Sequence, residues 1–119
     1  PVSYEELAHD SPKEGSQNIR NRVIKARLIQ ESRYLNSEGT HCNAQMSSKE
    51  IQKFCQIDES GSNILKNAMD KMGLSARAYD RILKVARTVA DLDNSETIEA
   101  IHLAEAIQMR SLDRENWAG

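Results

Sequence analysis

The sequence predicts an all-α fold, a compact bundle of about five helices. Apolar residues recur at the three- and four-residue spacing of amphipathic helices in several stretches, and no stretch shows convincing strand-type alternation. Aromatic residues make up only 4% of the chain, and glycine and proline are scarce, which argues against β-sandwich and collagen-like classes. With 119 residues, 39% of them hydrophobic, the chain has the length and the apolar content of one domain with a modest core.

Residues 1–15 contain both prolines and no sustained apolar period, so we expect a connecting arm there, with a disordered linker as the alternative. A long helix is expected over 17–35, because apolar residues fall on one face at helical spacing: Ile19, Val23 and Ala26. This helix carries five basic side chains and one acidic one. Residues 36–46 have turn chemistry and no period, which predicts the longest internal loop.

Two short helices are expected next. Ser47 and Glu50 match the capping-box pattern Ser-x-x-Glu, which predicts a helix over 48–55. Asp58 or Ser60 can cap a third helix over 60–72. Gly73 follows that helix, where a left-handed C-terminal cap belongs.

The strongest helical pattern covers residues 75–92, with Ser75 as its N-terminal cap. Its two faces separate cleanly. The apolar side chains are Tyr79, Ile82, Leu83, Ala86, Val89 and Ala90, and the basic ones on the opposite side are Arg77, Arg81, Lys84 and Arg87. A last helix is expected over 98–110, so the bundle spans 16–110 and residues 111–119 form a polar C-terminal tail.

The basic stripe on the helix over 75–92 is the one group of residues whose pattern predicts a binding function. Arg77 lies in the first turn, where free N–H groups already favour an anion, and its guanidinium could bind phosphate oxygens bidentately. A solvated helix face, with Asp80 and Arg81 as neighbours of Arg77, is the alternative. We expect Arg87 to form a structural ion pair. Asp91 and Asp93 are expected to cap and solubilise the helix end.

Other chemistries find little support. The phosphate-binding pattern Gly-x-x-x-x-Gly-Lys-Ser/Thr is absent, so the chain cannot be a complete nucleotide hydrolase by itself. Cys42 beside His41, with Cys55 and His102 elsewhere, lacks the spacing of a zinc site or a nucleophile pair, and no metal site is expected. Cys55 is expected in the core, and the histidines at the surface or in local hydrogen bonds.

No apolar run approaches the length of a membrane span, and no signal peptide is visible. The two cysteines cannot build a disulfide framework, so a cytoplasmic location is expected. The net charge of −2 argues against bulk attraction to nucleic acid. Because the first residue is not methionine, we expect an excerpt of a longer protein.

Long runs of this sequence resemble a known family. GLSARAYDRILKVARTVADLD (73–93) and HLAEAIQMRSLDR (102–114) closely resemble the C-terminal helical domain of magnesium-chelatase-related AAA+ ATPases. The closer branch is the bacterial competence-protein type (YifB and ComM). VSYEEL near the start, IRNRVIKARLIQESRY and NAQM agree with it, so the resemblance covers about residues 2–114.

The resemblance implies an AAA+ lid in which a Ser-x-Arg supplies the sensor-2 arginine that reaches the γ-phosphate of ATP. The matching residues are Ser75, Ala76 and Arg77. Ser75, Arg81 and Lys84 are then candidate contacts to nucleotide, a neighbouring subunit or DNA. No catalytic residue is expected on this chain, and the helicase-related parent would hydrolyse ATP with Mg²⁺.

The resemblance also implies partners. They are the missing N-terminal ATPase core, neighbouring subunits of a hexameric ring, and DNA through the parent, in DNA processing or branch migration. Two readings without a nucleotide role stay open. One is a helical nucleic-acid-binding module. The other is a protein-interaction module that docks through its acidic C-terminal region, which includes Asp113 and Glu115.

Overall fold

The computed structural model describes the backbone of residues 4–118 and the side chains of residues 16–110. This part of the chain is entirely helical and has no strand, which confirms the all-α prediction. The elements in chain order are α1 (Tyr4–Arg33), the 3₁₀ turn η1 (Asn43–Gln45), α2 (Ser48–Phe54), α3 (Glu59–Met72), α4 (Ala76–Leu92) and α5 (Ala100–Ala118).

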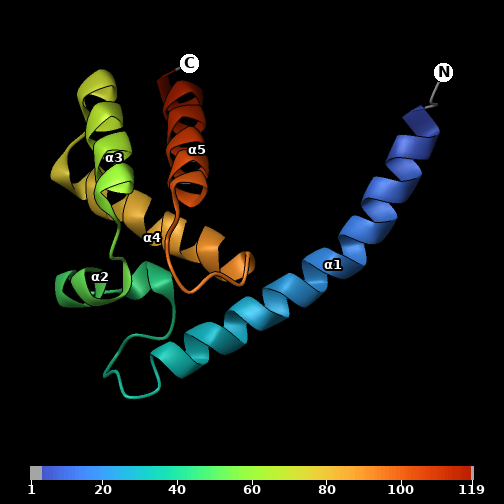
Figure 1. Cartoon of the computed structure of the whole chain (residues 1–119), viewed down its shortest axis with the longest axis horizontal. Helices are drawn as coiled ribbons and strands as arrows, with labels where there is room; N and C mark the ends of the chain where they lie inside the picture. The colour runs from blue at the N-terminus through green and yellow to red at the C-terminus, as the bar shows by residue number, and fades with distance from the viewer. Residues whose placement is uncertain (1–3, 119) are drawn as a thin grey trace.

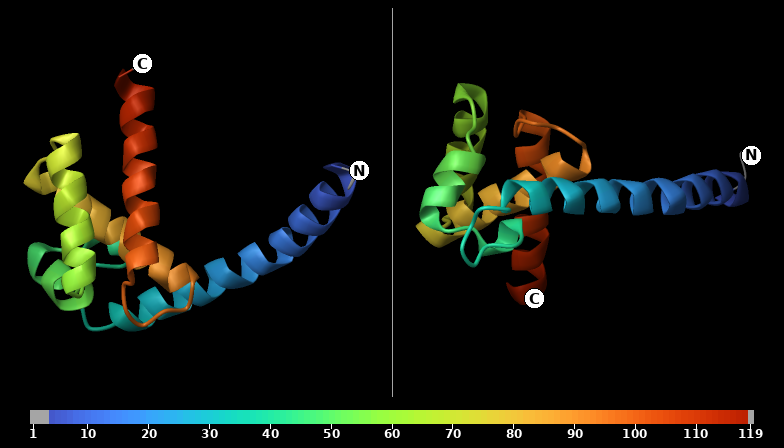
Figure 2. Two further views of the ribbon diagram at one scale, coloured as in Figure 1. Left: turned by 45° about the horizontal axis from the view of Figure 1, so that its top comes forward. Right: turned by 90° about the horizontal axis from the view of Figure 1, so that it is seen from below.

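Helix α4 organises the bundle. It packs against α5, α1, α2 and η1, while α5 also packs against α3. Figure 1 shows α3 and α5 standing side by side across α4, with α1 reaching away from the bundle as a long arm. The two further views in Figure 2 show the same arm from other directions. The N-terminal part of α1 therefore lies outside the packed body.

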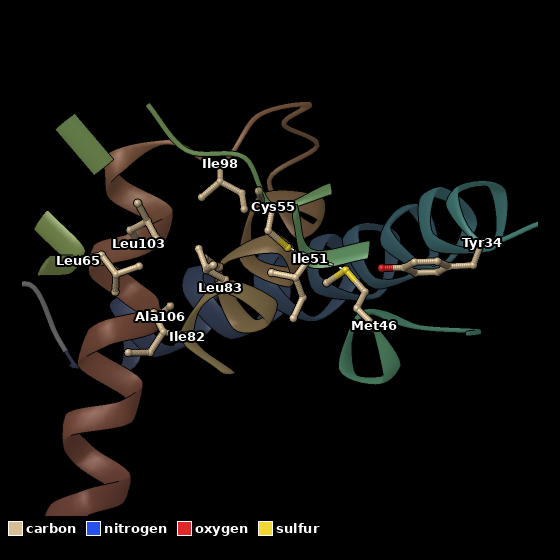
Figure 3. Close-up of a cluster of buried hydrophobic side chains, with 12 residues drawn as sticks. Tyr34, Met46, Ile51, Cys55, Leu65, Ile82, Leu83, Ile98, Leu103 and Ala106 are labelled. Atoms are coloured by element: carbon tan, nitrogen blue, oxygen red, sulfur yellow. Dashed lines mark hydrogen bonds between the residues drawn. The ribbon is translucent and has the colours of Figure 1, made fainter. Parts of the chain in front are cut away.

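The core is an elongated cluster of aliphatic side chains with few aromatics. Leu65 and Leu103 are fully buried, and Ile82 is 1% exposed. Figure 3 shows these three side chains near one end of the cluster and Tyr34 with Met46 near the other. The cluster joins α3, α5 and α4 to the α2 region and the end of α1, so one core holds the bundle together.

The caps that the sequence predicts are present. Ser47 and Glu50 form a complete capping box at α2, and the Asp58 side chain accepts the Gly61 N–H at α3. Gly73 ends α3 in the left-handed conformation, with φ 60° and ψ 43°, which glycine adopts without steric cost. These helix boundaries depend on neighbours in sequence, and the predictions for them are confirmed.

The start of α1 differs from the prediction. The helix begins at Tyr4, within the expected arm, and ends at Arg33. The prolines and the missing apolar period suggested an irregular segment, yet the backbone stays helical through Pro12, and Figure 1 shows the helix curved along its length. Once a helix is nucleated, adding a residue costs far less than starting a new one, so such signals do not always end it.

The apolar face predicted for α1 is only partly buried. Ala26 is buried, but Ile19 is 56% exposed and Leu28 is 58% exposed. Val23 and Ile24 are exposed as well. The described contacts of α1 with α4 lie toward the C-terminal end of both helices, where Arg22 Nε donates to the Leu92 carbonyl at 3.1 Å. Periodicity identified the apolar residues correctly but could not say that α1 projects from the bundle.

The last helix is shifted relative to its prediction. It begins at Ala100 and its backbone continues to Ala118, beyond the expected end at residue 110. Ile98 precedes the helix and is buried, whereas Ile101, which was expected on the apolar face, is 62% exposed. The side chains of the predicted acidic docking residues Asp113 and Glu115 lie outside the described residues.

Candidate functional site

The N-terminus of α4 is held in place by its cap and by its buried face. The Ser75 hydroxyl accepts the Ala78 N–H at 3.3 Å, and Gly73 turns the chain from α3 into α4. Ala78 and Ile82 are 2% and 1% exposed, so the first turns of α4 are anchored in the core. This support fixes the backbone that carries Arg77.

Arg77 and Arg81 extend from this anchored turn into solvent. Both side chains are exposed, and the four-residue spacing places them one above the other on α4. Within the side chains that the structure describes, neither guanidinium has a hydrogen bond or an ion pair. Two like charges at this spacing repel each other, so an anion placed between them would be stabilised.

Lys84 does not join these two arginines. It is partly buried, and its Nζ donates to the Ala44 carbonyl in η1 at 3.1 Å. Arg87, the fourth member of the predicted stripe, is 3% exposed. The structure therefore corrects the continuous basic stripe. Ser75, Arg77 and Arg81 lie together at the N-terminal half of α4, while Lys84 and Arg87 serve internal contacts.

Asp91, near the C-terminal end of α4, is the centre of a buried polar network. The Arg33 guanidinium donates two hydrogen bonds to its carboxylate, with N–O distances of 2.7 and 2.8 Å. Arg87 Nε donates to it at 3.1 Å, and the Asn43 amide donates at 2.8 Å. Asp91 is 1% exposed, and these four hydrogen bonds use the full accepting capacity of a carboxylate.

Asn43 connects this network to the loop after α1. Its side-chain oxygen accepts from Arg33 at 2.9 Å and from the Tyr34 hydroxyl at 2.6 Å, and its amide also donates to Thr88 at 3.0 Å. Burial raises the pKa of Tyr34 to about 12, which keeps the hydroxyl protonated as a donor. Burial alone would lower the pKa of Arg33, but the hydrogen bonds and charge of Asp91 outweigh it and the net shift is upward.

The sequence identified this network only in part. The structural ion pair expected for Arg87 is confirmed, and its four-residue spacing to Asp91 was the available signal. The surface capping role expected for Asp91 is wrong, because the residue is buried. No local pattern linked Arg33 or Asn43 to it, since Arg33 lies 58 residues away from Asp91 in sequence.

His102 has a local structural role, as expected from its sequence context. It is 2% exposed, its Nδ1 accepts the Glu99 N–H at 2.9 Å, and its Nε2 lies 2.9 Å from the Asp93 carboxylate. Because Nδ1 accepts from the backbone, Nε2 carries the proton and donates to Asp93. The pair fixes the turn between α4 and the start of α5.

Cys55 has the surroundings of a core residue. Cys55 is buried in the core, as predicted, and burial raises the pKa of its thiol to about 11, so it stays protonated and unreactive. Among the described residues, no three His, Cys, Asp or Glu side chains gather in a way that could hold a metal ion. Within the same part of the chain, no helix is long and apolar enough to cross a membrane.

Comparison with known proteins identifies the family to which this chain belongs. Residues 13–110 match the family described as magnesium chelatase, subunit ChlI C-terminal. The chain belongs to this ChlI C-terminal family. The match covers the caps, the central helix α4 and the buried network, so it accounts for the whole described bundle apart from the start of α1 and the end of α5.

Relatives of this ChlI C-terminal domain agree. The chain is 43% identical over 101 residues to competence protein ComM of Haemophilus influenzae, covering 85% of this chain and 19% of that protein. It is 40% identical over 103 residues to the uncharacterized protein YifB of Escherichia coli, covering 87% of this chain and 19% of that protein. The chain therefore spans about a fifth of the length of these relatives.

Proposed function

We propose that this ChlI C-terminal domain is the helical lid of a ring-forming AAA+ ATPase and that Arg77 senses the phosphate of bound ATP. The observation that carries the proposal is Arg77 itself. It is an exposed, unpaired arginine on a capped and core-anchored helix turn. An arginine held in this way can interact with developing phosphate charge without being reorganised, which is the main requirement of electrostatic catalysis.

The residues of this chain fit the phosphate end of the nucleotide rather than its metal. Guanidinium groups match phosphate oxygens, and Arg81 offers a second one a turn away from Arg77. Among the described side chains, no carboxylate cluster is suited to Mg²⁺. In this proposal the ligands of Mg²⁺ and the hydrolytic residues belong to the ATPase core, and the domain alone does not hydrolyse ATP.

The experiment is ATP turnover by the full-length parent, comparing wild type with Arg77→Ala in the presence and absence of DNA. We expect a fall of about tenfold or more, equivalent to about 1.4 kcal/mol of transition-state stabilisation. Lys66→Ala, at an exposed basic position on α3, serves as the control and is expected to retain turnover. Unchanged turnover in a folded Arg77→Ala protein would contradict the proposal.

Mixed rings would show which ATP Arg77 reaches. Parent subunits carrying Arg77→Ala are combined with subunits whose core cannot hydrolyse ATP. If Arg77 acts on the neighbouring subunit's nucleotide, mixing restores turnover, because the subunit with the inactive core still carries an intact Arg77 on its helical domain. If Arg77 acts on the nucleotide of its own subunit, mixing restores nothing.

A nucleic-acid-binding module is the second candidate, favoured by a specific observation on α1. Arg20, Lys25 and Arg27 are exposed on a helix that projects from the bundle. Binding through phosphate contacts weakens steeply with salt. Fluorescence anisotropy with labelled single- and double-stranded DNA at two salt concentrations tests this candidate, and no binding at low salt would remove it. The role in DNA processing rests on the resemblance and is tested by the same titration.

A further inference from the structure

A small surface cavity lies between α4 and α5. Its volume is about 50 Å³, and six residues line it: Arg81, Ile82, Val85, Ala106, Met109 and Arg110. Ile82 and Ala106 are buried and form an apolar floor. Val85 and Met109 are 37% and 47% exposed, so apolar side chains also reach the surface at the cavity mouth. We call this set of six residues the α4–α5 groove.

Two arginines flank this apolar surface and have no counter-charge among the described side chains. Neither Arg81 nor Arg110 makes an ion pair or hydrogen bond with any described side chain. The Nε of Arg110 is buried and lacks a hydrogen-bond partner. Buried polar groups in folded proteins are nearly always hydrogen-bonded, and leaving a charged donor unpaired is costly. The groove therefore combines an apolar floor with two guanidinium groups that have no anionic partner among the described side chains.

The combination favours a protein ligand over a nucleic acid. Phosphates would pair with the two arginines but would leave Val85 and Met109 exposed to water. A segment with carboxylates beside an apolar side chain satisfies both parts of the groove. Arginine and methionine are also enriched in protein interfaces relative to other surface.

We propose that the α4–α5 groove docks an acidic segment of a partner protein. The segment places an apolar side chain against Val85 and Met109 and its Asp or Glu carboxylates on Arg81 and Arg110. This inference does not require nucleotide sensing by Arg77. It gives Arg81, offered above as a second phosphate contact, a carboxylate partner as well, and it assigns a role to Arg110.

The test uses a defined probe, a synthetic helical peptide of alternating Leu and Glu turns, titrated into the ¹⁵N-labelled 119-residue chain. Two matched peptides replace Glu by Gln or by Lys. We expect the acidic peptide to shift the amide resonances of Arg81, Val85, Met109 and Arg110. The Gln peptide is expected to bind about tenfold or more weakly, because it lacks the charge. Equal binding by the Gln peptide, or shifts confined to other faces, would overturn the proposal.

Variants of the chain locate the contact. Arg81→Glu, at an exposed position, is expected to weaken binding of the acidic peptide by about tenfold or more through like-charge repulsion. Lys66→Glu on α3, at an exposed position outside the groove, carries the same charge change and is expected to bind as wild type. Met109→Ser removes apolar contact without altering charge, and we expect it to weaken binding too. Circular dichroism establishes that each variant is folded. Undiminished binding by Arg81→Glu and Met109→Ser would refute the proposal that the acidic peptide docks in the α4–α5 groove.

A short DNA duplex, titrated in the same way, provides the final comparison. We expect it to leave the resonances of Val85 and Met109 unchanged. Tighter binding of the duplex than of the acidic peptide at these residues would assign the groove to nucleic acid and overturn the protein-docking proposal. Failure of Arg77→Ala to alter ATP turnover would leave this test unaffected, because no nucleotide is present in it.

Discussion

The two halves of α4 use arginine in opposite ways. In the N-terminal half, Arg77 and Arg81 are exposed and have no partner among the described side chains. In the C-terminal half, Arg87 is 3% exposed and shares the Asp91 carboxylate with Arg33. On one helix, arginines at the N-terminal end are free to bind a ligand, whereas the arginine at the C-terminal end is already paired inside the protein.

The difference follows from the cost of burying charge. A charge inside a protein must be paired and hydrogen-bonded, because water no longer solvates it. Arg87 meets this requirement through Asp91 and through the carbonyl oxygens of Ser95 and Glu96, at 2.6 and 3.0 Å. An exposed arginine needs no such partner, because water solvates its charge. The presence or absence of an internal partner therefore distinguishes the structural arginine from the exposed ones.

The largest expected effect comes from removing the shared carboxylate. Asp91→Ala leaves Arg33 and Arg87 in the interior without their counter-charge, and breaking a buried pair in this way costs about 3–5 kcal/mol. We expect a loss of this size in the free energy of unfolding, measured by urea denaturation. Asp70→Ala on α3, at an exposed position, is the control and is expected to stay within about 0.5 kcal/mol of wild type. A loss below about 1 kcal/mol for Asp91→Ala would show that the network does not hold the fold.

A smaller change in the free energy of unfolding is expected from substitutions that compare the two halves of α4. Arg87→Met leaves Asp91 paired with Arg33 and Asn43 but abandons two backbone carbonyls, so we expect a loss of about 2 kcal/mol. Arg77→Met is expected to change the free energy of unfolding by less than about 0.5 kcal/mol, because it removes no described contact. Urea denaturation of the two variants side by side measures the contrast. Equal losses would abolish the distinction between the two halves of the helix.

The smallest expected effect concerns the capping box at α2. Hydrogen bonds from the Ser47 backbone and from the Thr40 and Ser37 hydroxyls lower the pKa of Glu50 from its ordinary value of 4.5 to about 2. A carboxylate whose pKa is lower in the folded state stabilises the fold above its unfolded pKa. That contribution is lost as the pH falls from about 4.5 through about 2.

Thermal unfolding of wild type and Glu50→Gln across this pH range isolates the effect. We expect the wild type to be the more stable protein near neutral pH and the difference in Tm to shrink as the solution is acidified through the window. The other carboxylates titrate in both proteins, so the difference reports Glu50. Parallel Tm curves would mean that the ionised carboxylate adds nothing to the cap.

The sequence was most informative where structure depends on near neighbours. The caps at Ser47, Asp58 and Ser75 and the left-handed turn at Gly73 were all predictable, because each hydrogen bond closes within a few residues. The exposed position of Arg77 on the polar side of α4 followed from the same helical period. The burial of Arg87 on that side did not, because it depends on what packs over it.

The sequence by itself determined the helical class, most helix starts and the placement of Arg77 beside a cap. Only the tertiary structure decided which polar residues would be buried, because burial depends on which helix faces meet. Asn43 and Asp91 lie 48 residues apart, yet they hydrogen-bond once α1, η1 and α4 pack together. The same packing leaves most of the apolar face of α1 exposed and places Arg81 and Arg110 in the lining of one cavity. Local interactions determine where the helices form, and long-range contacts determine which of their charged side chains are paired.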